Sequence, residues 1–239
     1  MLRAIPVCLA LLALTTQSAC LRDTVRGSGT IAKKDLAQSD FDRVEIGSAF
    51  DATIRRAESC SAVVFLDDNL MPYLQVSREG RTLGIRMQPG RDYRASSEGM
   101  RVEIGLPSLA GLDLSGASHA RLSGFDAEQA AVELELSGAS EATGKLAARE
   151  LVLALSGASD ITLTGAVHEL KLRASGASKA RLAELRVEEA GVSLSGASEA
   201  TVHAATALDV TASGASDLAY LGSPRLSEKC SGASSVRKR

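Results

Sequence analysis

Hydrophobic and polar residues alternate with a period of two along the second half of the chain, on both sides of a recurring tetrapeptide, Ser-Gly-Ala-Ser. Aliphatic residues occupy the fifth, third and first positions before most copies, and the residues between them are mostly polar. The aliphatic sets read Ala110-Leu112-Leu114, Val132-Leu134-Leu136, Leu151-Leu153-Leu155, Leu170-Leu172-Ala174, Ala190-Val192-Leu194 and Leu208-Val210-Ala212. The alternation resumes after the tetrapeptide, as in Ile161 and Leu163 against Asp160 and Thr162. This pattern predicts β-strands that bury one face and expose the other.

The tetrapeptide occurs seven times without substitution, and successive copies are offset by 22, 19, 19, 20, 18 and 18 residues. Recurrence at a near-constant period is typical of a stacked repeat architecture, because one such unit cannot bury its apolar face alone. We therefore predict an all-β fold, a parallel β-helix or β-solenoid with rungs of about 18–22 residues. Each rung is expected to hold a strand, a tight corner, a second strand and a return loop.

The serine and glycine that open each copy are the predicted structural corners. Glycine adopts backbone angles that are closed to other residues, and serine hydroxyls can satisfy backbone groups within a corner or between adjacent rungs. The corner residues are Ser115 and Gly116, Ser137 and Gly138, Ser156 and Gly157, Ser175 and Gly176, Ser195 and Gly196, Ser213 and Gly214, and Ser231 and Gly232.

Residues 41–107 form a less regular part of the same domain. Short apolar runs separated by Asn, Pro and Gly predict strands near residues 41–46, 50–54, 62–66, 74–76, 83–87 and 101–106. No helical period is sustained there, and residues 91–99 read as a polar loop. The repeat part is expected over residues 108–236.

The last copy departs from the pattern. Glu228 and Cys230 take positions that hold aliphatic residues in the other copies, and Lys238 falls where Leu163 or Val202 would be expected. We interpret this as the end of the solenoid, because a terminal repeat must tolerate water. Cys230 is expected to be a small core residue, and residues 237–239 are expected to form a solvated basic tail.

The N-terminus carries an export signal. Arg3 precedes an apolar run from Ile5 to Leu14 that is too short to span a membrane, and a small-residue region ends at Cys20. The pattern favours a lipoprotein signal peptide over residues 1–19, lipidation of Cys20 and a tether over residues 20–40. An ordinary secretory signal cut near Ser18 or Ala19 is the alternative. Leu21 after the lipidated cysteine resembles an outer-membrane sorting signal.

Composition narrows the classes of function. The formal net charge is −2, which gives no support to nucleic-acid binding. Aromatic residues make up only 3% of the chain and tryptophan is absent, so the core must be aliphatic. In an exported chain Cys60 and Cys230 could pair, and the sequence leaves that question open. No cysteine and histidine spacing predicts a zinc site, and no cofactor is expected.

The sequence shows no catalytic constellation. The serines are explained by the corners, and His119, His168 and His203 fall at different positions of different repeats. Residues directly after the corners form an outward column, in which neighbouring carboxylates could share a divalent cation or could simply be solvated. The residues considered for surface contact are Arg121, Glu141, Asp160, Lys179, Arg181, Glu199 and Asp217, and Arg173 with the other outward arginines could meet acidic glycans.

Three segments resemble the head GIN domain family. They are Ser39-Asp40-Phe41-Asp42-Arg43-Val44-Glu45-Ile46, Asp68-Asn69-Leu70-Met71-Pro72-Tyr73-Leu74, and Leu106-Pro107-Ser108-Leu109 followed by Leu112-Asp113-Leu114-Ser115-Gly116-Ala117. The resemblance runs from about Gly27 to Ser234. It implies a β-helix-like fold related in shape to pectin-lyase solenoids, an autotransporter-adhesin-like role in the bacterial envelope, and no established active site.

These observations support two hypotheses. The first is a non-enzymatic lipoprotein of the cell envelope, anchored by its N-terminal lipid, that serves as a scaffold for adhesion or for contact with an envelope protein or glycan. The second is a carbohydrate-active or carbohydrate-binding β-helix, because enzymes that act on polysaccharides use this architecture. An enzyme would need acidic and basic residues converging on one outer face. The oligomeric state, and exposure to the cell surface or the periplasm, are left open by the sequence.

Overall fold

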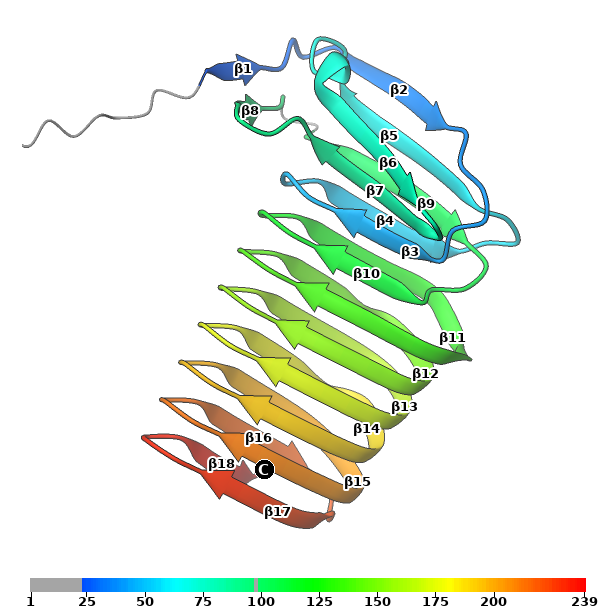
Figure 1. The fold of residues 1–239 in the computed structure, drawn as a ribbon. Helices are drawn as coiled ribbons and strands as arrows, with labels where there is room; N and C mark the ends of the chain where they lie inside the picture. The colour runs from blue at the N-terminus through cyan, green and yellow to red at the C-terminus, as the bar shows by residue number, and fades with distance from the viewer. Residues whose placement is uncertain (1–22, 97–98) are drawn as a thin grey trace, which may run out of the picture.

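A computed structural model describes residues 23–96 and 99–239. The fold is all-β, with 67% of the described residues in strands and about seven turns of a β-solenoid (Figure 1). The strands are β1 Thr24–Arg26, β2 Ile31–Leu36, β3 Arg43–Ile46, β4 Asp51–Arg56, β5 Ser61–Asp67, β6 Leu74–Glu79, β7 Thr82–Met87, β8 Asp92–Arg94, β9 Arg101–Leu106, β10 Gly111–Leu114, β11 His119–Leu136, β12 Glu141–Leu155, β13 Asp160–Ala174, β14 Lys179–Leu194, β15 Glu199–Ala212, β16 Asp217–Leu221, β17 Arg225–Cys230 and β18 Ser235–Lys238, and η1 Met71–Tyr73 is a 3-10 turn.

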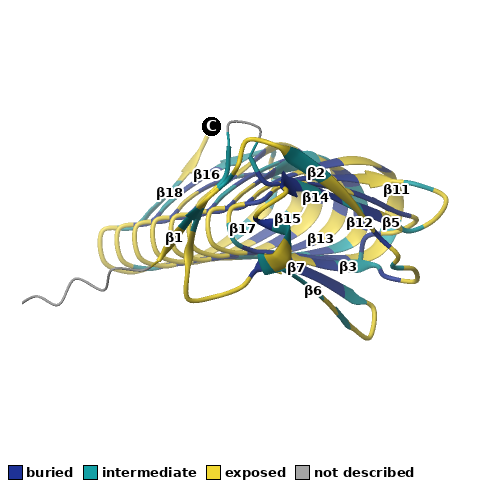
Figure 2. Ribbon diagram, turned by 90° about the horizontal axis from the view of Figure 1, so that it is seen from above, coloured by how far each residue is buried: buried dark blue, intermediate teal, exposed yellow. Residues whose placement is uncertain are grey.

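The stack presents two long faces of parallel strands. Strands β7, β3 and β10, the later halves of β11–β15, and β17 pair in that order and form the first face, which we call the groove face. Strands β9 and β4, the earlier halves of β11–β15, then β16 and β18 form the second, the charged face. Apart from the half-buried Ala110, the aliphatic positions predicted from alternation are buried. Figure 2 shows buried segments along the strands. The predicted β-solenoid is therefore confirmed.

The return loops expected between the two strands of a rung are replaced by continuous strands. Strands β11 to β15 each run from one corner to the next over 14–18 residues and bend on the way. Register shifts mark these bends, for example between Leu122 and Phe125 and between Leu182 and Arg186. Bulges of this kind turn a strand while its neighbours stay hydrogen-bonded, so no separate loop is needed.

The corners stack backbone upon backbone. Each corner glycine has a φ between 72° and 79°, which is the left-handed region. A Cβ built on Gly157 would lie 2.4 Å from the carbonyl oxygen of Gly138 one rung earlier. The N–H of Ala158 donates to that same oxygen at 2.7 Å. Glycine is therefore required both by its φ and by the closeness of the neighbouring rung.

The two serines of a corner have different structural roles. The fourth residue, such as Ser159, is buried, and its hydroxyl donates to the carbonyl of Ser156 in the same corner at 2.7 Å. The first serine is exposed, and Ser137 donates weakly to Leu114 on the preceding rung at 3.3 Å. The predicted satisfaction of backbone groups by hydroxyls is confirmed, and the exposed serine of each corner stays available at the surface.

One corner in the N-terminal part is degenerate. Ile46 pairs with Leu114 and Asp51 pairs with His119, so residues 47–50 stand beside the first Ser-Gly-Ala-Ser corner. Ser48 and Ala49 adopt φ values of 67° and 64° there. The fourth position holds the fully buried Phe50 where the repeats hold a buried serine. The strands β3 and β4 are therefore a rung of the solenoid that lacks the repeat sequence.

Antiparallel strands close the N-terminal end of the stack. Strand β6 pairs antiparallel with β7 on the groove face, while β5 pairs with β9 and β2 pairs with β5 on the charged face. The tether predicted over residues 20–40 is consequently wrong for β1 and β2, because β2 supplies the outermost strand of this cap. The polar loop predicted over residues 91–99 likewise contains β8, which pairs with β1. The signal peptide over residues 1–19 and Cys20 lie outside the described residues.

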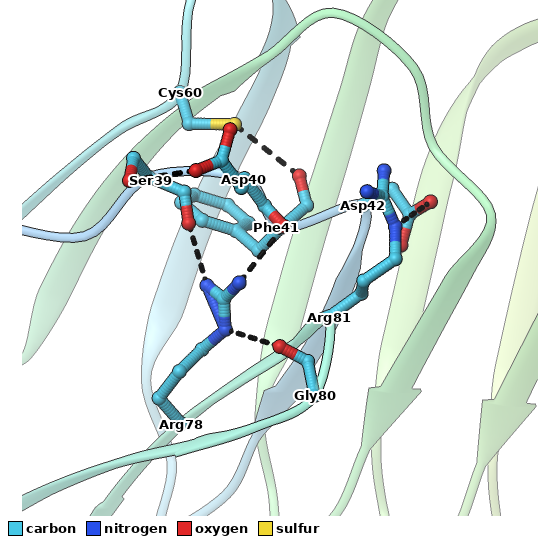
Figure 3. A network of polar contacts seen from close by, with 8 residues as sticks. All are labelled: Ser39, Asp40, Phe41, Asp42, Cys60, Arg78, Gly80 and Arg81. Carbon is cyan, nitrogen blue, oxygen red and sulfur yellow. Dashed lines mark hydrogen bonds and ion pairs between the residues drawn. The ribbon is translucent and has the colours of Figure 1, made fainter.

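The motif from Ser39 to Asp42 holds the β2–β3 connection against the β6–β7 turn (Figure 3). The Arg78 guanidinium donates to the backbone carbonyls of Ser39, Asp40 and Gly80 at 2.7–2.8 Å. It also lies 6.0 Å from the centroid of the Phe41 ring. Arg81 forms an ion pair with Asp42 at 2.8 Å. The residues that carry the family resemblance are thus used here to build the cap.

The C-terminal end has no such cover. Strands β17 and β18 form the last rung, and Cys230 is exposed although it pairs with the buried Ala212. The expectation of a buried Cys230 is therefore wrong, because no further rung packs over its column. Arg237 and Lys238 belong to β18 and not to a free tail. Cys60 and Cys230 are both free, at opposite ends of the stack, too far apart for a disulfide.

Candidate functional site

An elongated groove of about 820 Å³ runs along the groove face beside the ridge of corners. It is lined by residues two positions before each corner and by the first residue of each corner. The first set is Glu45, Asp113, Glu135, Ala154, Arg173, Ser193 and Thr211, and the second is Gly47, Ser115, Ser137, Ser156, Ser175, Ser195 and Ser213. Ser77 and Glu79 of β6 and Arg86 of β7 line its end at the cap. The volume is within the range of sites that bind ligands.

Three carboxylates stand in line at the cap end of this groove. Glu45 pairs with Asp113, and Asp113 pairs with Glu135, in register on the consecutive strands β3, β10 and β11. In-register residues of adjacent strands are about 4.8 Å apart. Two charges at that separation repel by about 1 kcal/mol in water and by more where water is partly excluded.

Asp113 is the central and least exposed of the three. Partial burial raises the pKa of its carboxyl to about 6, and the charges of Glu135 and Glu45 add to the rise while Arg43 opposes it. Arg43 itself is held by Glu133, whose carboxylate accepts a hydrogen bond from the guanidinium at 2.8 Å. Asp113 therefore carries a proton more readily than an ordinary aspartate, and a cation placed in the groove would lower its pKa.

Along the same column the chemistry changes from acidic to neutral. Ala154 follows Glu135, then Arg173, Ser193 and Thr211. The exposed corner serines give a parallel row of hydroxyls, one for each rung. The groove thus offers carboxylates, the guanidinium groups of Arg86 and Arg173, and a line of hydroxyl donors and acceptors in a fixed order, which is an arrangement suited to binding an extended ligand.

The surface residues proposed from the sequence lie on the charged face, except Arg173, which lines the groove. Asp51, His119, Glu141, Asp160, Lys179, Glu199 and Asp217 form one in-register column, and Arg121 and Arg181 belong to the next. The predicted outward column is therefore present, and no groove accompanies it in the cavities found along the described residues.

Most charges of that column are paired within the chain. Arg181 forms a close ion pair with Asp160, which raises the pKa of the arginine. Lys179 lies 4.0 Å from Glu199, and Arg237 lies 3.8 Å from Asp217. Residues 23–96 and 99–239 contain no group of three side chains placed to hold a metal ion. The charged face consequently has the character of a solvated surface.

The histidines are separated, as the sequence indicates. His119 lies 3.9 Å from both Asp51 and Glu141 on neighbouring rungs. His168 lies between Glu128 and Glu188 at 3.4 and 3.1 Å, and its hydrogen bond to Glu188 is the main reason that its pKa is raised. The contacts of His168 strengthen as its imidazole protonates, and the contacts of both histidines are surface ion pairs of small energy.

The groove carboxylates were not selected by sequence reasoning. Asp113 and Glu135 share the position two residues before a corner, and that signal is readable in the repeats. Glu45 shares it only if residues 47–50 are recognised as a corner, and their sequence, Gly-Ser-Ala-Phe, hides the correspondence. The three residues become one feature only when β10 is placed beside β3.

The described part of the chain contains no helix long and apolar enough to cross a membrane. Fold and groove together define a β-solenoid with an open, polar and partly acidic surface cleft. The chain belongs to the family described as "Putative auto-transporter adhesin, head GIN domain", whose model matches residues 40–224. No curated protein matches the chain.

Solved structures from Bacteroides and Parabacteroides share this fold. A putative adhesin from Bacteroides fragilis is 18% identical, with a TM-score of 0.81 over 90% of this chain and 100% of that chain. A putative lipid binding protein from Parabacteroides distasonis is 20% identical, with a TM-score of 0.70 over 91% and 100% of the two chains. A putative adhesin from Parabacteroides merdae is 18% identical, with a TM-score of 0.62 over 91% and 99%. At these identities the likeness establishes the fold.

Proposed function

We propose that this protein is an exported, lipid-anchored envelope protein that acts without catalysis, as a rigid scaffold whose groove contacts an external partner. The observation that carries the proposal is the groove of about 820 Å³, lined by rungs from the cap to β15. The adhesin names of the family and of its solved relatives support a role in contact. Cys20, placed after the signal-like segment, supplies the anchor.

The solenoid suits this role for a mechanical reason. Every rung is hydrogen-bonded to its neighbours through the strands and through the stacked corners. A row of groove residues is therefore held at fixed spacing before a partner arrives, which reduces the entropy lost on binding. The groove offers preorganised hydroxyls and charges, and it needs no moving loop to form.

Blocking the groove tests the contact role. Ala154 is half-buried on the groove face, and Thr162 is half-buried on the charged face. Beads coated with purified protein would be tested for retention on bacterial envelope fragments and on epithelial monolayers. We expect Ala154→Trp to abolish retention, because the indole fills the groove, and Thr162→Trp to preserve it. Equal retention of both variants would contradict the role of the groove.

Labelling tests the anchor separately. We expect cells that express the wild-type chain to incorporate palmitate into the protein, and cells that express Cys20→Ser to lose the label while still exporting the chain. A Cys20→Ser protein that retains the label would refute the lipoprotein assignment.

Incubation with acidic polysaccharides, followed for release of reducing or unsaturated ends, tests the alternative of a carbohydrate-active β-helix. Cleavage that depends on a groove carboxylate would replace the non-enzymatic proposal.

A further inference from the structure

The acidic column of the groove, Glu45, Asp113 and Glu135, forms no direct ion pair. Within residues 23–96 and 99–239, no lysine, arginine or histidine lies within ion-pair distance of these carboxylates. Arg43 acts on Asp113 through its charge alone, and its guanidinium is hydrogen-bonded to Glu133 at 2.8 Å. The repulsion within the column is therefore only partly offset, and its carboxylates face the groove.

Several other carboxylates of the stack form ion pairs with lysine or arginine side chains. Glu150 accepts a hydrogen bond from Lys171 at 2.8 Å, and Asp160 is paired with Arg181. Asp126 lies 3.2 Å from Lys145. The chain thus places cations one rung away from several of its stacked acids, whereas the carboxylates of the groove column form no such ion pair.

We infer that the groove binds an extended basic segment of a partner polypeptide, whose lysine or arginine side chains meet Glu45, Asp113 and Glu135. The inference rests on the groove being the contact surface proposed above. Ammonium and guanidinium groups form charge-assisted hydrogen bonds with carboxylates, and complementary charge favours both encounter and register.

The rest of the groove favours a polypeptide over a sugar chain. Its lining holds no aromatic ring among the residues that the structure describes, so a sugar ring finds no aromatic face to stack on. The exposed corner serines can instead hydrogen-bond to the peptide groups of an extended segment. Arg173, two rungs beyond Glu135, would attract an acidic residue that follows the basic ones and would set the direction of the segment.

Protonation of Asp113 gives the proposed binding of a basic segment a dependence on pH that can be tested. The groups that face Asp113 are Glu45 and Arg43 from β3 and Glu135 and Glu133 from β11. Since the pKa of Asp113 is about 6, the column is more negative at pH 7 than at pH 5. Affinity for a basic segment should therefore fall as the pH is lowered through 6, and it should fall with added salt.

Fluorescence anisotropy with labelled pentalysine tests the inference on the full-length protein at low ionic strength. We expect wild type to bind pentalysine and to ignore pentaglutamate. The triple variant Glu45→Gln, Asp113→Asn, Glu135→Gln should lose at least tenfold in affinity. The control triple Glu141→Gln, Glu199→Gln, Asp217→Asn removes the same charge from the other face and should stay within twofold of wild type. Thermal melts establish that both triples are folded, and relief of repulsion should keep the groove triple stable.

Three results would overturn the inference. Wild type that fails to bind pentalysine contradicts it, and so does an equal loss in both triples, which would assign binding to net charge alone. Binding of partly deacetylated amino-sugar oligomers in preference to pentalysine, abolished by the groove triple, would reject the polypeptide while leaving the groove as the contact surface. The two proposals can also fail separately. If Ala154→Trp loses bead retention while wild type does not bind pentalysine, the groove remains the contact surface and the basic segment is rejected.

Discussion

The repeat stack and the N-terminal cap hold their strands in place in different ways. From Gly111 onward each rung is placed by its backbone, because corner glycines touch corner carbonyls and strands pair in register. In residues 24–106 the rungs are interrupted by antiparallel strands, and single side chains hold them together. Asp67 and Arg78 are the clearest examples. Repetition makes stability a shared property of the stack, while the cap depends on individual residues.

The largest expected effect compares two corners. Gly157 packs on the corner of another repeat, whereas Gly116 packs on the degenerate corner of residues 47–50. Gly157→Val and Gly176→Val should each destabilise the protein by more than about 4 kcal/mol, because a Cβ there meets the neighbouring rung's carbonyl and the φ is unfavourable. Gly157→Ala should cost about 3 kcal/mol, whereas Gly116→Ala should cost about 1 kcal/mol. A Cβ on Gly116 would meet the Ser48 nitrogen at 3.1 Å, a milder contact. Denaturant unfolding measures the difference.

The controls lie on the charged face. Glu141→Ala and Lys179→Ala should each change the free energy of unfolding by less than about 0.5 kcal/mol, since both side chains are exposed. If these substitutions cost as much as Gly157→Val, the stacked-corner account of stability is wrong.

The next largest effect concerns Asp67 in the cap. Its buried carboxylate accepts hydrogen bonds from the N–H groups of Gly29 and Ser96 at 2.7 and 2.9 Å, which ties two loops to β5. Asp67→Asn should destabilise the protein by about 2 kcal/mol, because an amide replaces the charged acceptor. Asp68→Asn, at the exposed neighbour, is the matched control and should cost less.

The pH dependence of the free energy of unfolding gives a second test of the role of Asp67. Burial raises the pKa of Asp67, but the hydrogen bonds from Ser96 and Gly29 outweigh it and leave the pKa lowered. A lowered folded-state pKa gives stability that is present above the unfolded pKa of about 3.9 and is lost as the pH falls through the folded value. Unfolding curves of wild type should therefore weaken below pH 4 more than those of Asp67→Asn. Parallel curves would contradict the role of this carboxylate.

The smallest expected effect, at Asp113, is a gain of stability and not a loss. Because the pKa of Asp113 is raised to about 6, its ionisation opposes folding above that pH, and stability should increase as the pH falls from 7 through 6. Asp113→Asn should stabilise the protein at pH 7 by about 1 kcal/mol, a value already reduced for solvent screening at a half-exposed site. A loss of stability in this variant would mean that the carboxylate is needed by the fold.

Sequence patterning predicted the repeat stack and six strands of the N-terminal part, β3 to β7 and β9, but it missed β1, β2 and β8. Alternation around seven identical corners identifies the buried columns from Leu112 to Ala212, and the structure buries them. The same reasoning treated β2 as tether, since Ile31–Leu36 contains Lys33, Lys34 and Asp35. An edge strand that pairs on one side can carry such residues, so composition alone does not distinguish it from a linker.

The candidate site shows the same division. The outward residues of the charged face follow directly from parity, and they are where the pattern predicts. The groove depends on which strands become neighbours, because β3 enters between β7 and β10 although it precedes both in the chain. Glu45 and Asp113 are 68 positions apart in sequence and adjacent in the sheet.

The sequence by itself determined the solenoid, its rung length, the inward and outward columns and the need for glycine at the corners. These are local consequences of a period of two and of a repeated turn. Tertiary structure alone decided the order of the first rungs, the closed N-terminal end, the open C-terminal end and the acidic groove. The physical reason is that a stacked sheet brings together residues from distant segments, and their charges act on one another only after the strands have paired.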